Sequence, residues 1–320
     1  MIAYGPHDPR TIVALFAALA ATLLAGLAIS RLGSRPLARA AAWALILVAT
    51  IGGERLTADE PPGLRMLAIV ALLFTAMKSA VTVDGMPPGT RLPPARWLAF
   101  AAMWPGMRPT IFATAGGPPR PGATELLARG AERLVEGVVL CAAARWAWNA
   151  TGSLPLATVL LLPGLSLMLH FGVFNLAAGA WRALGVDAEP LFRAPLAATS
   201  LTEFWGRRWN LAFSEMTSIA IYRPVSDALG RGVGILAAFL TSGLLHEVAI
   251  SLPVRQGFGM PLAYFALHGA LVLFEKRTGR PRRAKRLWTW LWVVGPLPIL
   301  FHRPFLAGVV WPLLGASRGW

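Results

Sequence analysis

The sequence predicts an all-α protein that crosses a membrane many times, and three observations support this. The chain of 320 residues is 56% hydrophobic and only 14% charged, and its mean hydropathy is +0.57. Several apolar stretches reach the roughly 20 residues that a helix needs to cross a bilayer. The charged residues lie mostly between those stretches, where membrane topology places them. We therefore expect one polytopic helical domain over residues 1–320, with about eight or nine transmembrane helices.

The N-terminal part, residues 1–122, is predicted to hold three spans and one interfacial segment. The segment from Trp97 to Trp104 is apolar but too short to cross, and its tryptophans favour the headgroup level. Lys78 and several arginines in or beside the following Pro/Gly-rich stretch place that stretch on the cytoplasmic face. The three spans run from Thr11 to Ser30, from Leu37 to Gly52 and from Leu64 to Val83.

The C-terminal part, residues 123–320, is predicted to hold five further spans and a short final apolar run that could be a ninth. The first of them begins with a charged half and becomes apolar toward Trp148. The predicted spans are 123–148, 154–181, 232–253, 260–275 and 287–301, and the final run is 305–314.

Basic residues gather in alternate connections, and this alternation predicts the topology. The connections from Arg182 to Arg231 and from Lys276 to Arg286 are rich in arginine and lysine. The positive-inside rule places them in the cytoplasm and the N-terminus outside. Arginine far outnumbers lysine, and Ala, Gly and Pro are abundant, which indicates a GC-rich bacterial genome. We therefore expect the protein in a cell membrane, namely the bacterial inner membrane.

The composition also bears on other function classes. The net charge of +15 is spread over the loops rather than one domain, which argues against a nucleic-acid-binding protein. A single cysteine, Cys141, allows no intramolecular disulfide. The five histidines are scattered and have no metal-ligand spacing. We expect neither a metal nor a resident cofactor.

His246 lies inside a predicted span and is the first candidate for chemistry. It follows Gly232 by fourteen residues, which is about 20 Å along a helix. A histidine at that depth is costly and should be neutral, so that it is able to accept a proton. Ser242 lies one turn earlier on the same face, whereas Glu247 points about 100° away. The alternative is a histidine that only hydrogen-bonds to a neighbouring helix.

A second candidate is the polar and aromatic segment from Glu203 to Asn210. If this segment is helical, Glu203, Arg207 and Asn210 lie on one side, and Trp205 and Trp209 stack along another. Guanidinium groups suit phosphate oxygens, and aromatic faces suit an adenine ring. The alternative is an ordinary membrane-interface belt of Trp and Arg.

At these residues the chain resembles the wax synthase-like branch of the membrane-bound O-acyltransferases. The likeness covers roughly the C-terminal half, and the first 120 residues add only hydrophobicity. Other branches, such as the diacylglycerol acyltransferases, have a shorter motif without Gly206-Arg207-Arg208 in its middle. The resemblance is carried by Ser-Leu-Thr-Glu-Phe-Trp-Gly-Arg-Arg-Trp-Asn at 200–210 and Ser-Gly-Leu-Leu-His-Glu at 242–247, with further likeness at 169–175, 190–195 and 300–302.

The resemblance implies an enzyme with an MBOAT-like bundle that transfers a fatty acyl chain from acyl-CoA to a hydroxyl of a lipophilic acceptor. His246 matches the family's catalytic histidine, and Asn210 matches its polar partner. Acyl-CoA is then a co-substrate, its phosphates meeting Arg207 and Arg208, and the membrane lipid surrounds the protein. Residues expected to bind substrate are Glu203, Phe204, Trp205, Arg207, Arg208, Trp209 and Ser242.

Two alternatives remain beside a long-chain alcohol as acceptor. The same transfer can act on another hydroxyl, such as that of a sterol-like, polyketide or glycan acceptor. From a different class, a proton-coupled transporter could use His246 and Glu247 as a relay. A transporter should carry acidic residues in several spans, whereas Glu247 is nearly the only carboxylate deep in an apolar run.

Three other histidines are assigned lesser roles. His268 could face His246 across a helix pair but is expected mainly to line or pack. His302 is expected at an interface, because it ends a span beside Arg303. His170, with Asn175, is expected to make interhelical hydrogen bonds.

Overall fold

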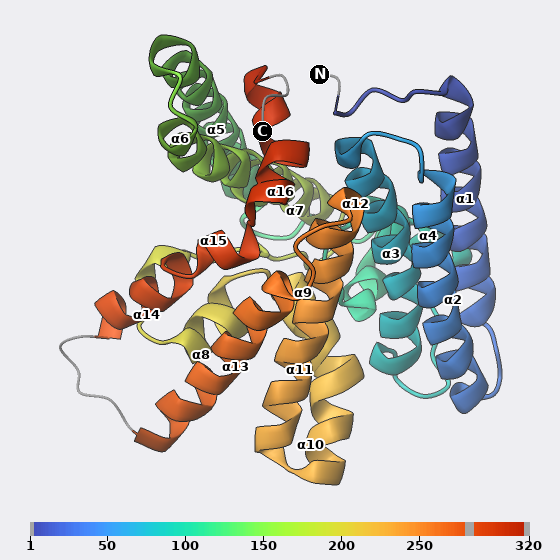
Figure 1. The fold of residues 1–320 in the computed structure, drawn as a ribbon. Helices are drawn as coiled ribbons and strands as arrows, with labels where there is room; N and C mark the ends of the chain where they lie inside the picture. Colours follow the sequence, from blue (N-terminus) through green and yellow to red (C-terminus); the bar gives the residue numbers. More distant parts are fainter. Residues whose placement is uncertain (1–2, 279–284, 317–320) are drawn as a thin grey trace.

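The computed structural model describes residues 3–278 and 285–316, and these residues form helices with no β-strand among them. The helices assemble into a bundle in which the residues after 200 pack against the N-terminal helices (Figure 1). The predicted all-α class is confirmed.

Three long helices form an antiparallel row at the N-terminal side: α1 (Pro9–Ile29), α2 (Arg35–Leu56) and α3 (Pro62–Gly85). Each begins with proline in its first turn, where the missing N–H costs nothing. Within its apolar window, α3 is 61% buried, against 22% for α1 and 28% for α2. The inner helix α3 therefore joins the row to the rest of the molecule, and we call α1–α3 the frame.

The expected interfacial segment is instead part of the core. It forms α4 (Pro94–Met103), which is followed by η1 (Pro109–Thr114). Trp97 and Trp104 are only 1% and 3% exposed, so the prediction that their rings lie at the headgroup level is wrong. The Trp97 indole donates a hydrogen bond to the Thr82 hydroxyl on α3, 3.1 Å away, which gives the ring a polar partner inside the protein.

The middle of the chain forms α5 (Ala123–Thr151), which packs along a second helix of 30 residues. Glycines allow the two backbones to approach: a Cβ at Gly137 would lie 2.7 Å from the Gly164 carbonyl oxygen. The second helix is continuous and consists of α6 (Leu154–Ser166), the π-helical η2 (Leu167–Val173) and α7 (Phe174–Ala183).

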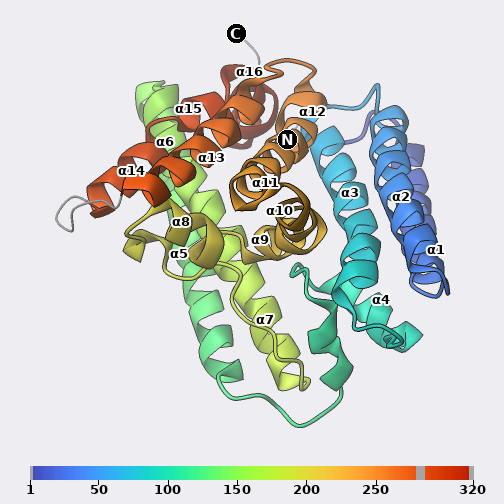
Figure 2. The same cartoon turned by 90° about the horizontal axis from the view of Figure 1, so that it is seen from below.

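Residues 211–254 form an antiparallel helical hairpin, which we call the central hairpin. Seen from below, its arms α10 and α11 lie between α3 and α13 (Figure 2). Its first arm was predicted as part of a cytoplasmic loop but is a helix packed against the second arm. The arms meet at Gly230, whose φ of 89° suits glycine. The first arm is α9 (Leu211–Thr217), η5 (Ser218–Tyr222) and α10 (Arg223–Leu229), and the second is α11 (Arg231–His246), η6 (Glu247–Ser251) and α12 (Leu252–Val254).

The C-terminal helices close one side of the central hairpin. The predicted span 287–301 and the final apolar run 305–314 form a pair of helices bent by 68°. Pro304 lies in the first turn of α16, and the buried His302 caps that helix, which accounts for the break. These helices are α13 (Met260–Thr278), α14 (Lys285–Val294), α15 (Leu297–Leu300), α16 (Arg303–Phe305), η7 (Leu306–Val310) and η8 (Trp311–Leu314).

Five of the described helices are long and apolar enough to cross a membrane, or six if the bent pair counts as one. They are α1, α2, α3, the α6–α7 helix and the second arm of the central hairpin. Helices also form at the predicted spans 123–148 and 260–275, but charged residues occupy one end of each. The total of eight or nine crossings stays a prediction.

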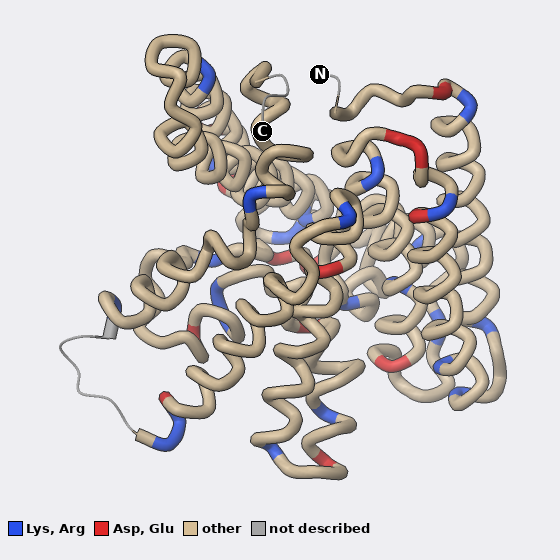
Figure 3. The backbone as a smooth tube through the Cα atoms, viewed as in Figure 1, with Lys and Arg blue, Asp and Glu red and all other residues tan. Residues whose placement is uncertain are grey.

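Charged residues of both signs occur along the bundle, but some of its turns differ in charge (Figure 3). The turns from α1 to α2 and from α10 to α11 carry basic residues at the same end. The acidic turn between α2 and α3 lies at the opposite end. Arg280, Arg282 and Arg283 of the predicted basic connection lie outside the described residues.

Candidate active site

The central hairpin brings His246 and the start of its first arm together. Asn210 caps the first arm, and His246 ends α11 on the second. Phe213, one turn after Asn210, lies edge-on to the His246 ring with 5.7 Å between ring centroids. The two residues predicted to be catalytic therefore lie at the ends of neighbouring helices that are joined by the Phe213–His246 contact.

The His246 ring is oriented by its own helix. Nδ1 lies 2.7 Å from the Ser242 carbonyl oxygen, which can only accept, so Nδ1 carries the hydrogen. Nε2 then has the lone pair and finds no hydrogen-bond partner among the described residues. The Phe265 ring covers the imidazole at 4.2 Å between centroids. This is the tautomer that a general base requires.

Asn210 adopts the left-handed conformation, with φ of 46°. Asparagine tolerates this region better than most residues. Its Oδ1 accepts a hydrogen bond from the Phe213 N–H at 3.3 Å and so caps α9. Because Oδ1 is engaged in this way, the side-chain amide nitrogen remains available as a donor.

The segment from Glu203 to Asn210 is not the regular helix on which the expected arrangement of its side chains depended. A short α8 (Leu201–Glu203) passes into the π-helical η4 (Phe204–Arg208), closed by a 2.8 Å bond from the Trp209 N–H to the Phe204 carbonyl. Trp209 then extends and stacks on Phe204 at 5.5 Å and 14°. The predicted stack of Trp205 on Trp209 is therefore wrong.

Trp205 points instead toward α13. Its ring lies 5.5 Å from Phe265 and 5.3 Å from His268, centroid to centroid. Since Phe265 also covers His246, Trp205 belongs to the aromatic shell one ring away from the imidazole. Phe204 is 2% exposed and serves packing.

Arg208 and Glu203 are partners of each other. The Arg208 Nη2 lies 2.6 Å from Glu203 Oε1, and its Nη1 donates to the Ala194 carbonyl at 3.1 Å. Hydrogen bonds from the Thr199 N–H and hydroxyl to the carboxylate, with Arg208 beside it, lower the pKa of Glu203 to about 2. This ion pair fixes the shape of the η4 turn. A substrate that contacted either side chain would have to compete with the ion pair.

Arg207 differs from its neighbour. It is exposed and has no hydrogen bond or ion pair within the part of the chain that the structure describes. Of the two arginines in the motif, it is the one whose guanidinium is free for an anionic ligand.

Ser242 and Glu247 have local roles. The Ser242 hydroxyl donates to the Ala238 carbonyl at 2.9 Å, while its own carbonyl holds His246. Glu247 Oε1 accepts from the N–H groups of Gly259 and Leu262 at 2.9 and 3.0 Å and thereby caps α13. The carboxylate is thus used in joining α13 to the hairpin.

Sequence reasoning missed Glu275, Phe213 and Phe265. Glu275 accepts from the Leu201 N–H at 3.1 Å and from the Trp288 indole at 3.0 Å, so it caps α8 and ties the motif to α13 and α14. In the sequence it precedes a basic run and looks like a loop residue. The two phenylalanines are indistinguishable there from lipid-facing ones.

The three histidines that were assigned lesser roles have partners other than the His246 ring. His268 is fully buried, with Nδ1 2.8 Å from the Tyr264 carbonyl, and packs on Trp205. His302 is 1% exposed and caps α16 by accepting from the Phe305 N–H, so its predicted interfacial position is wrong. The hydrogen bond of His170 is to Ser166 in the same helix rather than between helices, and its ring stacks on Phe192 at 4.4 Å.

Comparisons with known proteins agree with the predicted resemblance. Residues 188–267 match the model of the membrane bound O-acyl transferase family, and this range contains both Asn210 and His246. Two plant proteins are similar over part of the chain. A probable long-chain-alcohol O-fatty-acyltransferase 7 of Arabidopsis thaliana is 37% identical over 125 residues, and a long-chain-alcohol O-fatty-acyltransferase of Simmondsia chinensis is 40% identical over 101 residues.

The matched part is limited in length. It covers 35% of this chain and 37% of the Arabidopsis protein, and 29% of this chain and 29% of the Simmondsia protein. The resemblance to the wax synthase-like branch is thereby confirmed for the segment that carries the site.

Proposed function

We infer that the protein transfers a fatty acyl chain from acyl-CoA to the hydroxyl of a long-chain alcohol within the membrane. The observation that supports this proposal is the contact of Phe213, one turn after Asn210, with the His246 ring, inside the segment that resembles wax synthase-like acyltransferases. The names of the relatives supply the acceptor class. The structure contributes the orientation of the proposed base, His246, and of the proposed amide donor, Asn210.

In this reaction His246 Nε2 takes the proton of the alcohol hydroxyl while the oxygen attacks the thioester carbonyl carbon. The tetrahedral intermediate then collapses, the carbon–sulfur bond breaks, and the imidazolium returns the proton to the leaving thiolate. Ester and free CoA result, and His246 ends neutral. The Ser242 carbonyl supports this cycle because it keeps Nδ1–H bonded in both protonation states.

The amide nitrogen of Asn210 is assigned to the developing oxyanion or to the acceptor hydroxyl. A donor that is oriented in advance in a water-poor site stabilises charge that appears only in the transition state. The cap to the Phe213 N–H prevents the amide from turning its oxygen toward the reacting carbonyl. The amide thus presents hydrogen to the substrate.

Arg207 is assigned to the phosphates of the donor. It is the unpaired arginine of the motif, whereas Arg208 is bound to Glu203. We place the basic turns on the cytoplasmic side and the N-terminus outside. A relay from His246 to Glu247 is disfavoured because the Glu247 carboxylate caps α13.

The test uses the full-length protein in proteoliposomes with radiolabelled palmitoyl-CoA. A panel of alcohols, containing hexadecanol, a sterol and a sugar, is offered, and neutral ester is separated by chromatography. We expect ester with hexadecanol, and about 10²- to 10⁴-fold less with a matched His246→Ala protein. Ester formed only with the sterol or the sugar would show that the acceptor is not a long-chain alcohol. No ester with any alcohol would overturn the proposal.

A further inference from the structure

Helix α3 carries two buried basic residues for which the reaction has no direct use. Lys78 is fully buried and Arg65 is 4% exposed. Lys78 follows Arg65 by thirteen positions along the helix, which corresponds to about 20 Å. Basic side chains inside a membrane span are costly and usually mark a function. Lys78 was predicted to mark a cytoplasmic loop, so its burial is a correction.

Lys78 holds the segment that follows α4. Its amino group donates to the carbonyl oxygens of Trp104 and Gly106, both at 2.6 Å. It also lies over the faces of Phe100 and Phe74, 4.3 and 4.9 Å from the ring centroids. No carboxylate lies within ion-pair distance of Lys78 in the described chain. The Lys78 side chain therefore holds the backbone of residues 104–106 in place.

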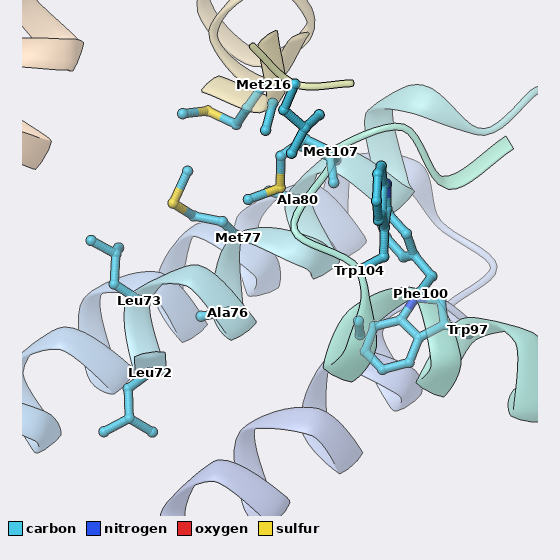
Figure 4. Close-up of a cluster of buried hydrophobic side chains, with 14 of the residues drawn as sticks. Leu72, Leu73, Ala76, Met77, Ala80, Trp97, Phe100, Trp104, Met107 and Met216 are labelled. Atoms are coloured by element: carbon cyan, nitrogen blue, oxygen red, sulfur yellow. The ribbon is translucent and has the colours of Figure 1, made fainter. Parts of the chain in front are cut away.

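The segment held by Lys78 reaches the first arm of the central hairpin. Arg108 follows Gly106 by two residues, and its Nη2 lies 2.6 Å from Glu215 Oε1 on α9. Glu215 lies just over one turn beyond Asn210. The side chains of Met107 and Met216 lie near each other at this junction (Figure 4), and both are buried. Lys78 is thus linked to α9 through the 104–108 segment and the Arg108–Glu215 ion pair.

Arg65 acts on the end of the second arm. Its Nη2 donates to both oxygens of Glu54 at 2.6 Å and to the Leu252 carbonyl at 3.3 Å. Glu54 also binds Arg255, directly after α12, at 3.0 Å. Arg255 has a φ of 53°, a conformation that a non-glycine residue keeps only when its surroundings hold it. The helix that carries His246 is thereby tied to the frame.

We propose that α3 positions the acyl-transfer site: Lys78 holds the arm that begins at Asn210, and Arg65 holds the arm that carries His246. This proposal rests on the proposed function, because the positions it explains are those of the base and the amide donor. Neither residue touches the site, so both are positioning residues. Together they set the separation between two side chains on different helices.

The first experiment measures ester formation by Lys78→Met, Arg108→Gln and the double variant. A small misplacement of catalytic groups costs up to about 10²-fold, so we expect kcat to fall about tenfold in each single variant while KM for acyl-CoA stays within about twofold. Because the two residues act in series, the double variant should be no worse than Lys78→Met alone. Arg108→Glu with Glu215→Arg should recover most of the activity. Arg39→Gln, which breaks the Arg39–Asp84 ion pair between α2 and α3, is the control and should leave kcat unchanged.

The second arm is tested by Arg65→Met and Arg255→Gln under the same assay. We again expect a loss in kcat at nearly constant KM. Additive losses in Lys78→Met and Arg108→Gln, or an unchanged kcat in both Lys78→Met and Arg65→Met, would overturn the proposal. Arg108 is half-exposed, so its variant remains informative if Lys78→Met does not fold.

A distance measurement separates this proposal from the proposed function. Spin labels are attached at Val70→Cys on α3 and Arg223→Cys on α10, in a Cys141→Ala background. The distribution of distances between the two labels is measured by pulsed electron paramagnetic resonance. We expect one narrow distribution that broadens in Lys78→Met and in Arg108→Gln. An unchanged distribution overturns the positioning role. Broadening in a protein that makes no ester would overturn the acyltransferase assignment alone.

Discussion

The frame and the central hairpin are both built from helices, but their backbones differ. In α1, α2 and α3 the helices are regular over 21, 22 and 24 residues. The central hairpin is interrupted by two π-helical segments, η5 and η6, and is preceded by η4 and by Asn210 in the left-handed conformation. Irregular backbone of this kind is costly and gathers at functional sites.

The difference indicates that the hairpin and the frame have different roles, namely catalysis and support. The π-helical η6 begins at the residue after His246, and η4 ends two residues before Asn210. Two of the three irregular segments, η4 and η6, therefore lie next to a residue assigned to chemistry, whereas η5 does not. The regular frame supplies rigidity and, through α3, the contacts that hold both arms. Changes in the hairpin should alter turnover, and changes in the frame should alter stability or positioning.

The largest effect is expected for His246→Ala. A general base contributes about 10²- to 10⁴-fold, so ester formation should fall by about that factor. The fold should persist because alanine suits a helix and removes a polar group from the apolar interior.

The matched control for this variant is His268→Ala. Both rings are held by the carbonyl four residues earlier, but His268 has no contact with the hairpin's catalytic pair and should lose far less activity. Turnover and size-exclusion profile are compared at equal protein. Near-normal turnover in a well-folded His246→Ala protein would refute the catalytic assignment.

Asn210 offers a second test because two of its roles can be separated. Glycine adopts the left-handed conformation freely and costs a helix cap only a few tenths of a kcal/mol. Asn210→Gly should therefore keep most of the stability but lose about 10²- to 10³-fold in kcat, as expected for an oxyanion donor. Asn210→Asp keeps the cap but lacks the donor, and it should lose activity as well. Full activity in Asn210→Asp would show that only the cap matters.

The sequence allowed the fold class and the embedded His246 to be predicted, because hydropathy and a histidine within an apolar run are local signals. It did not reveal that Lys78 and Trp104 are buried. A lysine near the end of a span is read as a loop charge, and only the folding back of the 104–108 segment supplies its two carbonyl partners.

The conformation of the motif at 203–210 could not be predicted from the sequence either. Its residue types were recognised, but a helical period was assumed from Glu203 to Asn210. The π turn and the left-handed Asn210 depend on the Glu203–Arg208 pair, on Glu275 from a distant helix and on the stack of Trp209 on Phe204. Such tertiary contacts leave no periodic pattern in the chain.

The two arginines of the motif should separate in kinetics. Arg207→Gln should raise KM for acyl-CoA about tenfold with little change in kcat, because loss of a charged hydrogen bond costs about 1.5 kcal/mol of uniform binding. Arg208→Gln should leave KM nearly unchanged but lower the melting temperature, since it removes the partner of Glu203. Steady-state kinetics and thermal unfolding of both proteins give the comparison. Equal rises in KM would place both guanidinium groups at the donor.

The smallest effect concerns the pH dependence of the motif itself. The pKa of Glu203 is lowered to about 2 from its ordinary value of 4.5 by the Thr199 hydrogen bonds and Arg208. A carboxyl with a depressed pKa stabilises the folded state fully above the unfolded pKa, and this contribution is lost as the pH falls through the folded pKa. Melting temperature in detergent should therefore drop between about pH 4.5 and pH 2 by more in the wild type than in Glu203→Gln, whose side chain does not titrate. The carboxylate is partly exposed, so salt should reduce the difference. Equal acid sensitivity of the two proteins would mean that Glu203 does not hold the turn, and the irregular backbone before Asn210 would then need another support.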